Sequence, residues 1–418
     1  MFVSILEYLP FLRSAMWLLS LSGGHSFFWN SDTKRFQLRE LKSYSAFASI
    51  SACAMIFVTV TMRIGAVLVG AGAIIHHITS LLIYIGTTTA YFMGIVAFLR
   101  ADEIVVCFNS LIQIEEKVKA EDPGAAPVIK FTKKNLRNLS STAWSLNKLI
   151  LADLKHGEPG RLIIMSSSFC QVVFPLLILF FLLESPCSSQ VFLRSTLADC
   201  QNHGFESLPA TLAPIIVLLD VYYIFCTWGQ GCIGIGSVFY LTALCIRDQL
   251  KRIRTTARAI PDMDHAIQNI RSYKEIQLLE RQFNNINRGG NLILVMTDMT
   301  FLGVTSLYST IALHDVVSAP ILALSIIMAV ETVLLAQMFM YGAAADLHTF
   351  SEGVKKCWKY NRAFQRNKYL KKLTGSCIEM KTQVGNSGNY VDKTTPLSAS
   401  QMTVEQTASL LLMTGKKT

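Results

Sequence analysis

Charged residues are scarce in this chain, and their scarcity excludes most classes of soluble protein. Only 16% of the 418 residues are Asp, Glu, Lys or Arg, whereas 51% are apolar, and the mean hydropathy is +0.40. The sequence also lacks a nucleophile elbow, a P-loop, an HExxH zinc motif and the protein-kinase signatures. Its ten cysteines follow no metal-binding spacing. We therefore expect a protein that is not an enzyme and that uses no cofactor and no metal.

Long apolar segments dominate what the chain does contain. Each is long enough to cross a bilayer, which needs about 20 apolar residues. A seventh segment, 396–414, is rich in Ser, Thr, Gln and Glu, so lipid cannot surround it and it must face protein or water. The fold class expected is all-α, a polytopic membrane protein with seven transmembrane helices. The six apolar segments are 44–62, 73–99, 162–183, 211–245, 292–313 and 317–341.

The basic residues between these segments alternate from gap to gap. Five Lys and Arg precede the first segment, and the other basic-rich stretches, 100–161, 246–291 and 342–396, hold ten, nine and ten. The gaps between them hold one, one and none. Basic flanks stay in the cytoplasm, so the N-terminus is expected inside. This pattern accounts for the net charge of +10 without nucleic acid as a partner.

The alternation also divides the chain into expected regions. They are a cytoplasmic N-terminal arm (1–43), a block of six transmembrane helices (44–341), a cytoplasmic helix with a loop (342–395), and a last helix (396–418). In the outside loop before the fourth segment, Cys187 and Cys200 are either a disulfide or two free thiols, since the outside is oxidising.

Two apolar stripes with helical spacing lie in the basic, cytoplasmic stretches. Such stripes favour long cytoplasmic helices packed on one another, and the alternative is helices lying on the inner leaflet. Trp358 extends the second stripe. The fourth segment is expected to continue below the membrane as a helix through Arg258, because Pro261 follows. The stripes are Ile276, Leu279, Phe283 and Ile286, and Leu347, Phe350, Val354 and Cys357.

Aromatic and ionisable residues in the outer halves of the segments suggest a pocket for a small molecule. Asp220 stands beside several aromatic residues in the fourth segment, and aromatic walls with a few polar groups suit organic ligands. Ordinary core packing and an interfacial aromatic belt are the alternative. The ligand-pocket candidates are Tyr84, Phe174, Asp220, Tyr223 and Tyr308.

Residues near the end of the chain carry a resemblance to a known family. The run Pro396-Leu397-Ser398-Ala399-Ser400 looks like the entry to a last helix, and Leu410-Leu411-Leu412 and Thr418 follow at the family's spacing. Residues 272–279 look like its cytoplasmic helix. With seven segments and an inside N-terminus, the chain resembles the arthropod (insect-type) chemoreceptor superfamily. The spacing favours the gustatory branch over the odorant branch. The family's Tyr-x4-Gln-Phe ending is absent, and we expect the last helix to be truncated.

The resemblance implies a ligand-gated, non-selective cation channel in the plasma membrane. Its subunits would form a homo- or hetero-tetramer in lipid, opened by a tastant or an odorant. The last helix would line the pore, with Gln401, Thr403, Glu405, Gln406 and Ser409 facing it. The cytoplasmic helices would form the anchor between subunits, through Ile276, Leu279, Phe283, Phe350, Val354 and Trp358.

Two other classes of membrane protein also have many helices. A G-protein-coupled receptor has seven, but its N-terminus lies outside, which the charge pattern opposes. A secondary transporter is built from paired halves with broken helices, and the sequence has no such symmetry. Both remain alternatives to the channel.

Overall fold

The computed structural model describes the chain almost continuously from residue 238 to residue 415 and describes the earlier residues in part. The described residues are almost all helical, with two short antiparallel hairpins, β1 (Phe27–Asn30) with β2 (Arg35–Leu38) and β3 (Gln383–Val384) with β4 (Asn389–Tyr390). They are residues 27–38, 54, 61, 88, 91–92, 95–121, 214–215, 217–219, 221–222, 238–287, 291–317, 319–385 and 388–415.

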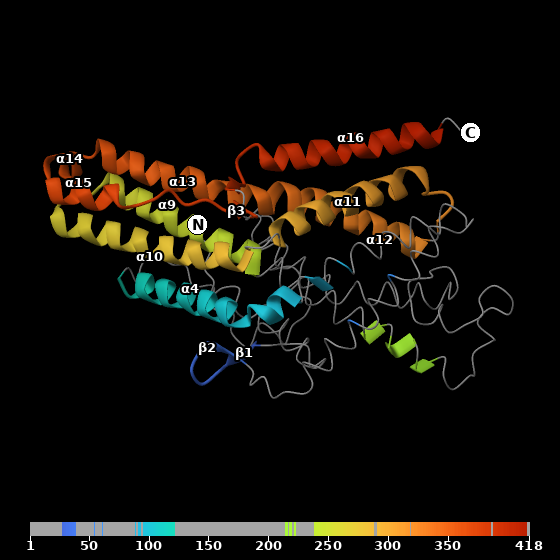
Figure 1. Cartoon of the computed structure of the whole chain (residues 1–418), viewed down its shortest axis with the longest axis horizontal. Helices are drawn as coiled ribbons and strands as arrows, with labels where there is room; N and C mark the ends of the chain where they lie inside the picture. The colour runs from blue at the N-terminus through green and yellow to red at the C-terminus, as the bar shows by residue number, and fades with distance from the viewer. Residues whose placement is uncertain are drawn as a thin grey trace, which may run out of the picture.

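The described helices form two groups along the long axis of the molecule (Figure 1). In the first group three long helices run side by side, a fourth helix packs beneath α10, and two short helices lie at the far end. These helices are α9 (Thr242–Arg258), α10 (Met263–Asn287), α13 (Tyr341–Tyr360), α4 (Ala101–Glu121), α14 (Arg362–Arg366) and α15 (Lys368–Gly375). The second group consists of α11 (Asn291–Ala312), α12 (Ala319–Ala329), η4 (Val330–Met340) and α16 (Thr395–Gly415).

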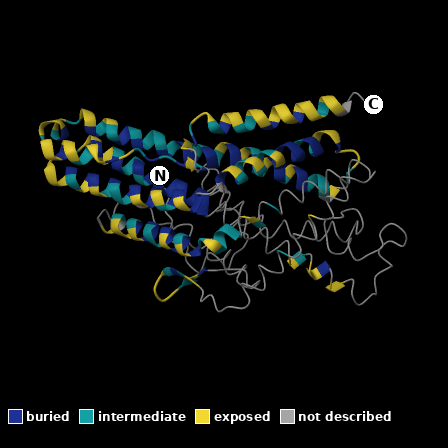
Figure 2. Ribbon diagram, in the orientation of Figure 1, coloured by how far each residue is buried: buried dark blue, intermediate teal, exposed yellow. Residues whose placement is uncertain are grey.

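The apolar stripes expected from the sequence are the core of the first group. All four stripe residues of α10 are buried, as are Leu347 and Val354 of α13, whereas Phe350 and Cys357 are half-buried. Figure 2 shows the buried sides of these helices turned toward one another. The prediction of packed helices is therefore confirmed, and the alternative of helices lying separately on the leaflet is wrong for this part of the chain.

A buried asparagine joins the three long helices. The indole Nε1 of Trp358 on α13 donates to Asn269 Oδ1 on α10 at 2.8 Å. The amide Nδ2 of Asn269 donates in turn to the carbonyl oxygen of Ile253 on α9 at 3.1 Å. The ring of Tyr273 meets Trp358 edge to face, with 5.0 Å between centroids. Satisfied polar groups of this kind fix one arrangement of a helical core.

The sequence predicts the end of α9, and the start of α10 follows closely. Helix α9 ends at Arg258, as expected, and Pro261 follows. Helix α10 begins after Asp262, whose Oδ1 accepts the backbone N–H of His265 at 2.9 Å. A carboxylate at this position satisfies one of the free N–H groups of the first turn.

Two stretches among the described residues are long and apolar enough to cross a membrane. Leu292–Ala312 lies in the second group, whereas Ile321–Tyr360 begins there and continues through α13 of the first group. The first coincides with the expected segment 292–313. The second is longer than the expected segment 317–341, because α12, η4 and α13 continue into one another without a break. Its middle, η4, is a π-helix of 11 residues, which the sequence did not predict. The π-helix is rare, appears mostly as a single-turn bulge within an α-helix, and is frequently found at functional sites.

Neighbouring leucines on α10 test the burial of this core. Leu279 is 2% exposed and Leu278 is 59% exposed. We expect Leu279→Ala to reduce the free energy of unfolding by about 2–5 kcal/mol, because it removes buried methyl groups and leaves a cavity. Leu278→Ala, the matched control, changes it by less than about 0.5 kcal/mol. Thermal unfolding of the detergent-solubilised protein measures both, and equal shifts would contradict the assigned core.

Candidate functional site

The last helix, α16, begins at an aspartate cap. Oδ1 of Asp392 accepts the backbone N–H groups of Thr394 at 3.0 Å and Thr395 at 2.8 Å, and both threonine hydroxyls at 2.8 Å. These hydrogen bonds, with that of the Thr395 side chain foremost, stabilise the carboxylate and lower the pKa of Asp392. Pro396 then occupies the first turn, where its missing N–H is not needed. The start of α16 is therefore fixed to within a residue.

One narrow side of α16 contacts the rest of its own chain. Thr403 and Thr407 on this side are 0% and 4% exposed. Gln337 of η4 donates from Nε2 to the hydroxyl of Thr403 at 2.8 Å. Gly303 of α11 lies opposite, and a Cβ atom there would be 2.9 Å from Cγ2 of Thr403. The absence of a side chain at Gly303 therefore allows α16 to pack closely against α11 and η4.

The remaining surface of α16 is exposed in the single chain, as Figure 2 shows. Four of the five residues expected to face a pore, Gln401, Glu405, Gln406 and Ser409, lie on it. Gln401 donates from Nε2 to Oε1 of Glu405 at 2.7 Å. The expectation for Thr403 is wrong, because its side chain is enclosed by α11 and η4. Apolar side chains share the exposed surface: Leu397, Met402, Val404, Leu410, Leu412 and Met413.

The residues expected to anchor one subunit to another lie instead inside the first helix group. Ile276, Leu279, Phe283, Val354 and Trp358 are each at most 2% exposed, and Phe350 is half-buried. Side chains enclosed by their own chain are not available to a partner, so the assignment of these five to subunit contacts is wrong. They stabilise the helical group that such contacts would use.

The expected ligand pocket is described at one position. Tyr308 is buried in α11 at 5% exposure, and it lines neither of the two cavities found near the first helix group. The other four candidates, Tyr84, Phe174, Asp220 and Tyr223, lie outside the described residues, as do Cys187 and Cys200. The pocket and the disulfide therefore stay predictions.

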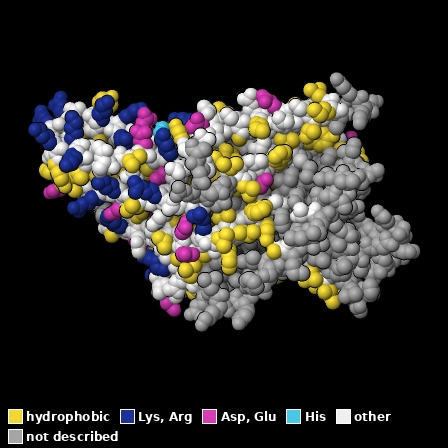
Figure 3. All heavy atoms as spheres, in the orientation of Figure 1, with side chains coloured by type: hydrophobic (Ala, Val, Ile, Leu, Met, Phe, Trp, Pro, Cys, Tyr) yellow, Lys and Arg dark blue, Asp and Glu magenta, His cyan; other side chains and the backbone are white. Residues whose placement is uncertain are grey.

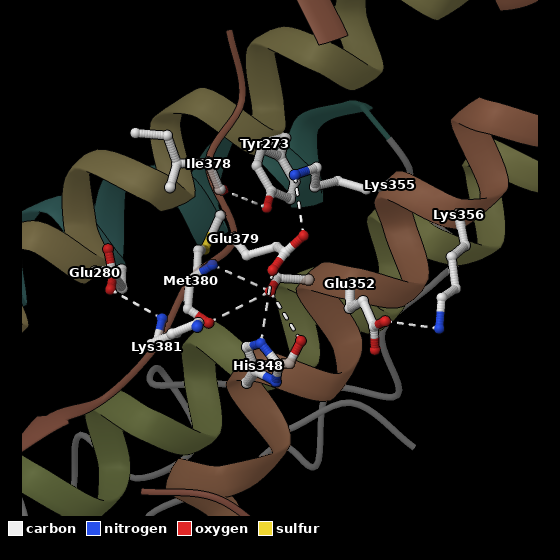
Figure 4. A network of polar contacts seen from close by, with 11 residues as sticks. Tyr273, Glu280, His348, Glu352, Lys355, Lys356, Ile378, Glu379, Met380 and Lys381 are labelled. Carbon is white, nitrogen blue, oxygen red and sulfur yellow. Dashed lines mark hydrogen bonds and ion pairs between the residues drawn. The ribbon is translucent and has the colours of Figure 1, made fainter. Parts of the chain in front are cut away.

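A linker of residues 376–394 connects α15 to α16, and its first part crosses α10 and α13 (Figure 4). Side chains of these helices bind its backbone. The hydroxyl of Tyr273 donates to the carbonyl of Ile378 at 2.8 Å, and the hydroxyl of Ser351 accepts the N–H of Met380 at 3.1 Å. Asn284 donates from Nδ2 to the carbonyl of Lys381 at 2.8 Å. Backbone without a strand or helix of its own thus has its hydrogen bonds satisfied.

Glu280 of α10 is the ionisable group at the centre of these contacts. The residue is 7% exposed, and its Oε1 accepts the N–H of Lys381 at 3.1 Å and Nδ2 of Asn284 at 2.5 Å. Burial disfavours the charged form and raises the pKa of Glu280 to about 7, although the two hydrogen bonds act in the opposite direction. The protonation state of this carboxyl group therefore changes near neutral pH.

Charged side chains make further contacts between the linker and α13. Glu379 pairs with Lys355 at 3.1 Å and lies 3.6 Å from Nε2 of His348. The hydrogen bond from Lys355 lowers the pKa of Glu379. The ammonium of Lys381 lies over the ring of Tyr390, 4.2 Å from its centroid. Between the linker, α10 and α13 the surface is hollowed into a cavity of about 690 Å³, lined mainly by polar and charged side chains.

Sequence reasoning missed these linker contacts, although a signal was present. Each apolar stripe residue of α10 is followed directly by a polar one. These polar residues are also buried, at 6–8% exposure, so a second stripe runs beside the first. Polar residues repeating at the same helical spacing as a core stripe indicate a buried polar seam. The second stripe is Gln277, Glu280, Asn284 and Asn287.

The close approach of Gly303 to Thr403 predicts that substitutions at these two residues have coupled effects on stability. Gly303→Ala places a methyl group against Cγ2 of Thr403 and should lower stability by about 1–3 kcal/mol through overpacking. Thr403→Ser removes that methyl group and keeps the hydroxyl that Gln337 binds. We expect the double variant to recover most of the loss, as thermal unfolding of all four proteins measures. Strictly additive effects would show that the two residues do not meet.

The raised pKa of Glu280 predicts a pH dependence of stability. Its ordinary pKa is 4.5 and its folded pKa is about 7, so the folded protein binds the proton more tightly. The resulting stabilisation is complete below pH 4.5 and is lost as the pH rises through 7, by an amount on the order of 1–3 kcal/mol. Glu280→Gln keeps the acceptor oxygen and removes the titration. Melting temperatures from pH 5 to pH 8 should fall more steeply in the native protein than in this variant, and parallel curves would contradict the assignment.

Comparisons with known proteins agree with the architecture. No family model matches the chain, and no curated protein matches it in sequence. Among solved structures, the insect olfactory receptor OR5 from Machilis hrabei matches with a TM-score of 0.65 at 11% identity, over 97% of this chain and 98% of that one. The same receptor in complex with eugenol matches with a TM-score of 0.58 at 10% identity, over 98% and 99%. Over nearly its whole length, the chain therefore has a fold similar to that of an insect olfactory receptor.

Proposed function

We propose that this protein is a chemosensory receptor of the insect type and acts as a subunit of a ligand-gated, non-selective cation channel. The observation that carries the proposal is the two-sided nature of α16. Its Thr403 side is seated on α11 and η4, while its Glu405 side carries carboxylate, amide and hydroxyl groups and is open in the single chain. The similarity of the whole chain to an olfactory receptor fold supports the same reading. No catalytic step is part of the proposal.

The polar side of α16 needs an environment that a bilayer does not offer. Charged and amide groups are costly in hydrocarbon and are found facing protein or water. Copies of the chain arranged around an axis would turn these sides toward one another and enclose water. In a tetramer, four Glu405 carboxylates would form a ring, and acidic rings attract cations. The exposed apolar residues of α16 would then face neighbouring helices or lipid.

A small organic molecule is the proposed ligand. The similar receptor has been solved in complex with eugenol, and the aromatic residues predicted to form the pocket suit such a compound. The spacing at the end of the chain favours taste, whereas the similarity to an olfactory receptor favours odorant detection as the alternative. Recording currents against a panel of tastants and odorants in cells that express the chain separates the two.

The plasma membrane, with the N-terminus inside, is the proposed location. The first helix group would then lie in the cytoplasm, where its Lys and Arg residues belong. Opening requires that the ligand bind the open state more tightly than the closed state. The linker is the covalent path from the cytoplasmic helices to α16, so its hydrogen bonds to α10 and α13 would set how far α16 can move.

Replacing Glu405 tests the pore assignment. We expect Glu405→Gln to lower the permeability of calcium relative to sodium several-fold, because the ring of carboxylates loses its charge. Glu405→Asp keeps the charge and should retain most of the selectivity. Glu352→Gln, which changes a carboxylate of α13 that pairs with Lys356 at 2.7 Å, is the control and should leave permeation unchanged.

Reversal potentials in mixed solutions measure the permeability ratio for each variant. An unchanged ratio in Glu405→Gln would remove this residue from the pore. A glycosylation tag that becomes modified at the N-terminus would place that end outside and contradict the topology, and with it the channel.

A further inference from the structure

The far end of the first helix group carries a dense run of positive charge. Between Lys355 and Lys372 the sequence has eight Lys and Arg and no Asp or Glu. Two of the eight are paired, Lys355 with Glu379 at 3.1 Å and Lys356 with Glu352 at 2.7 Å. The other six are exposed and have no ion pair among the residues that the structure describes. We call these six the basic tip: Lys359, Arg362, Arg366, Lys368, Lys371 and Lys372.

The basic tip is built on a rigid support. Asn361 and Asn367 cap α14 and α15 through their Oδ1 atoms, which accept the N–H groups of Ala363 and Tyr369, each at 2.9 Å. Asn361 also donates to the carbonyl of Ala257 on α9 at 3.2 Å. Apolar residues of both short helices are buried beneath, Phe364 at 3% exposure and Leu370 at 1%. The backbone that carries the positive charges is thus held in a fixed arrangement, which reduces the entropic cost of binding.

Two large aromatic side chains stand exposed among the charges. Tyr360 is 74% exposed and Tyr369 is 56% exposed. Arg and Tyr are the residue types enriched where proteins bind one another most tightly. Figure 3 shows Lys and Arg gathered at this end of the molecule, with apolar surface between them. Apolar surface of this kind is not expected on a charged face that contacts only water.

The positive-inside pattern is compatible with these charges, but it gives no reason for gathering six of them at the far end of the helix group. The rule that places basic residues inside concerns those close to the ends of the spans. Helix α13 has 20 residues, which carry the tip about 30 Å beyond η4. The field of anionic lipid head groups falls off within a Debye length of about 8 Å. A soluble partner fits this position better than the bilayer does.

We propose that the basic tip is a docking surface for an acidic segment of a cytosolic protein, with Glu or Asp on the six cations and apolar side chains on Tyr360 and Tyr369. A protein fits better than a nucleic acid because carboxylates stand at the edge of the tip. Asn367 donates to Sδ of Met263 at 3.4 Å, which places the exposed Asp262 and Asp264 beside it. They would repel a continuous phosphate backbone, whereas a peptide can offer them a basic residue. That the partner is cytosolic rests on the proposed topology.

Binding of labelled peptides to the purified full-length protein in detergent tests the proposal. The probe is a 12-residue peptide of Glu with interspersed Leu, and its matched control has Gln in place of Glu. Lys368→Glu with Lys372→Glu should weaken binding of the acidic probe about tenfold. Arg271→Glu with Arg281→Glu makes the same change of net charge on exposed positions of α10 and should weaken it less than about twofold.

A second variant separates docking from general attraction of charges. Tyr360→Ala with Tyr369→Ala leaves the net charge unchanged and should weaken binding about fivefold or more, since it removes the apolar contacts. Equal losses in the two charge-reversed proteins, no loss in the tyrosine variant, or tighter binding of polyuridylate or of phosphatidylserine vesicles than of the peptide would each overturn the proposal. The assay uses no current, so a silent channel leaves its outcome intact.

Discussion

The hydrogen bonds between α10 and the linker are the constraint on which the position of the last helix depends. This stretch of linker has little secondary structure of its own, and a buried peptide group without a partner costs about 1–3 kcal/mol. Glu280 of α10 accepts the backbone N–H of Lys381, and Asn284 of α10 donates to the carbonyl oxygen of Lys381. Ser351 of α13 accepts the backbone N–H of Met380. Because the same segment leads directly to the cap of α16, the core of the first helix group determines where that helix begins.

These contacts are less favourable than the apolar core beside them. Burial of Glu280 raises its pKa to about 7, so keeping the group ionised in this place costs free energy. An apolar residue would bind α10 to its neighbours more strongly, but it would leave the N–H of Lys381 without an acceptor. The seam is thus specific rather than strong, and its strength changes with protonation.

Features of the fold that depend on local spacing and backbone sterics can be predicted from the sequence, whereas features that depend on contacts between distant residues cannot. Apolar periodicity was enough for the packed faces of α10 and α13, and proline for the end of α9 at Arg258, because local spacing and backbone sterics decide them. Helix α16 falls within one residue of its expected limits. The polar seam was missed because pattern reading counts only apolar residues as core. The subunit contacts were misassigned because burial inside a chain and burial between chains leave the same stripe in the sequence.

The error at Thr403 has a geometric origin that also explains why Glu405 remains a pore candidate. The polarity of α16 indicates that some of its sides avoid lipid, but it does not indicate which sides. The rotation of the helix about its own axis is set by one close contact that is far away in sequence, at Gly303. Once Thr403 is seated there, with Thr407 buried on the same side, helical geometry fixes the direction of every other residue, since each residue turns the chain by about 100°. Glu405 then lies about 200° from Thr403, on the side away from α11 and η4. The absence of a side chain on α11 thereby aims the one carboxylate of α16 out of its own subunit.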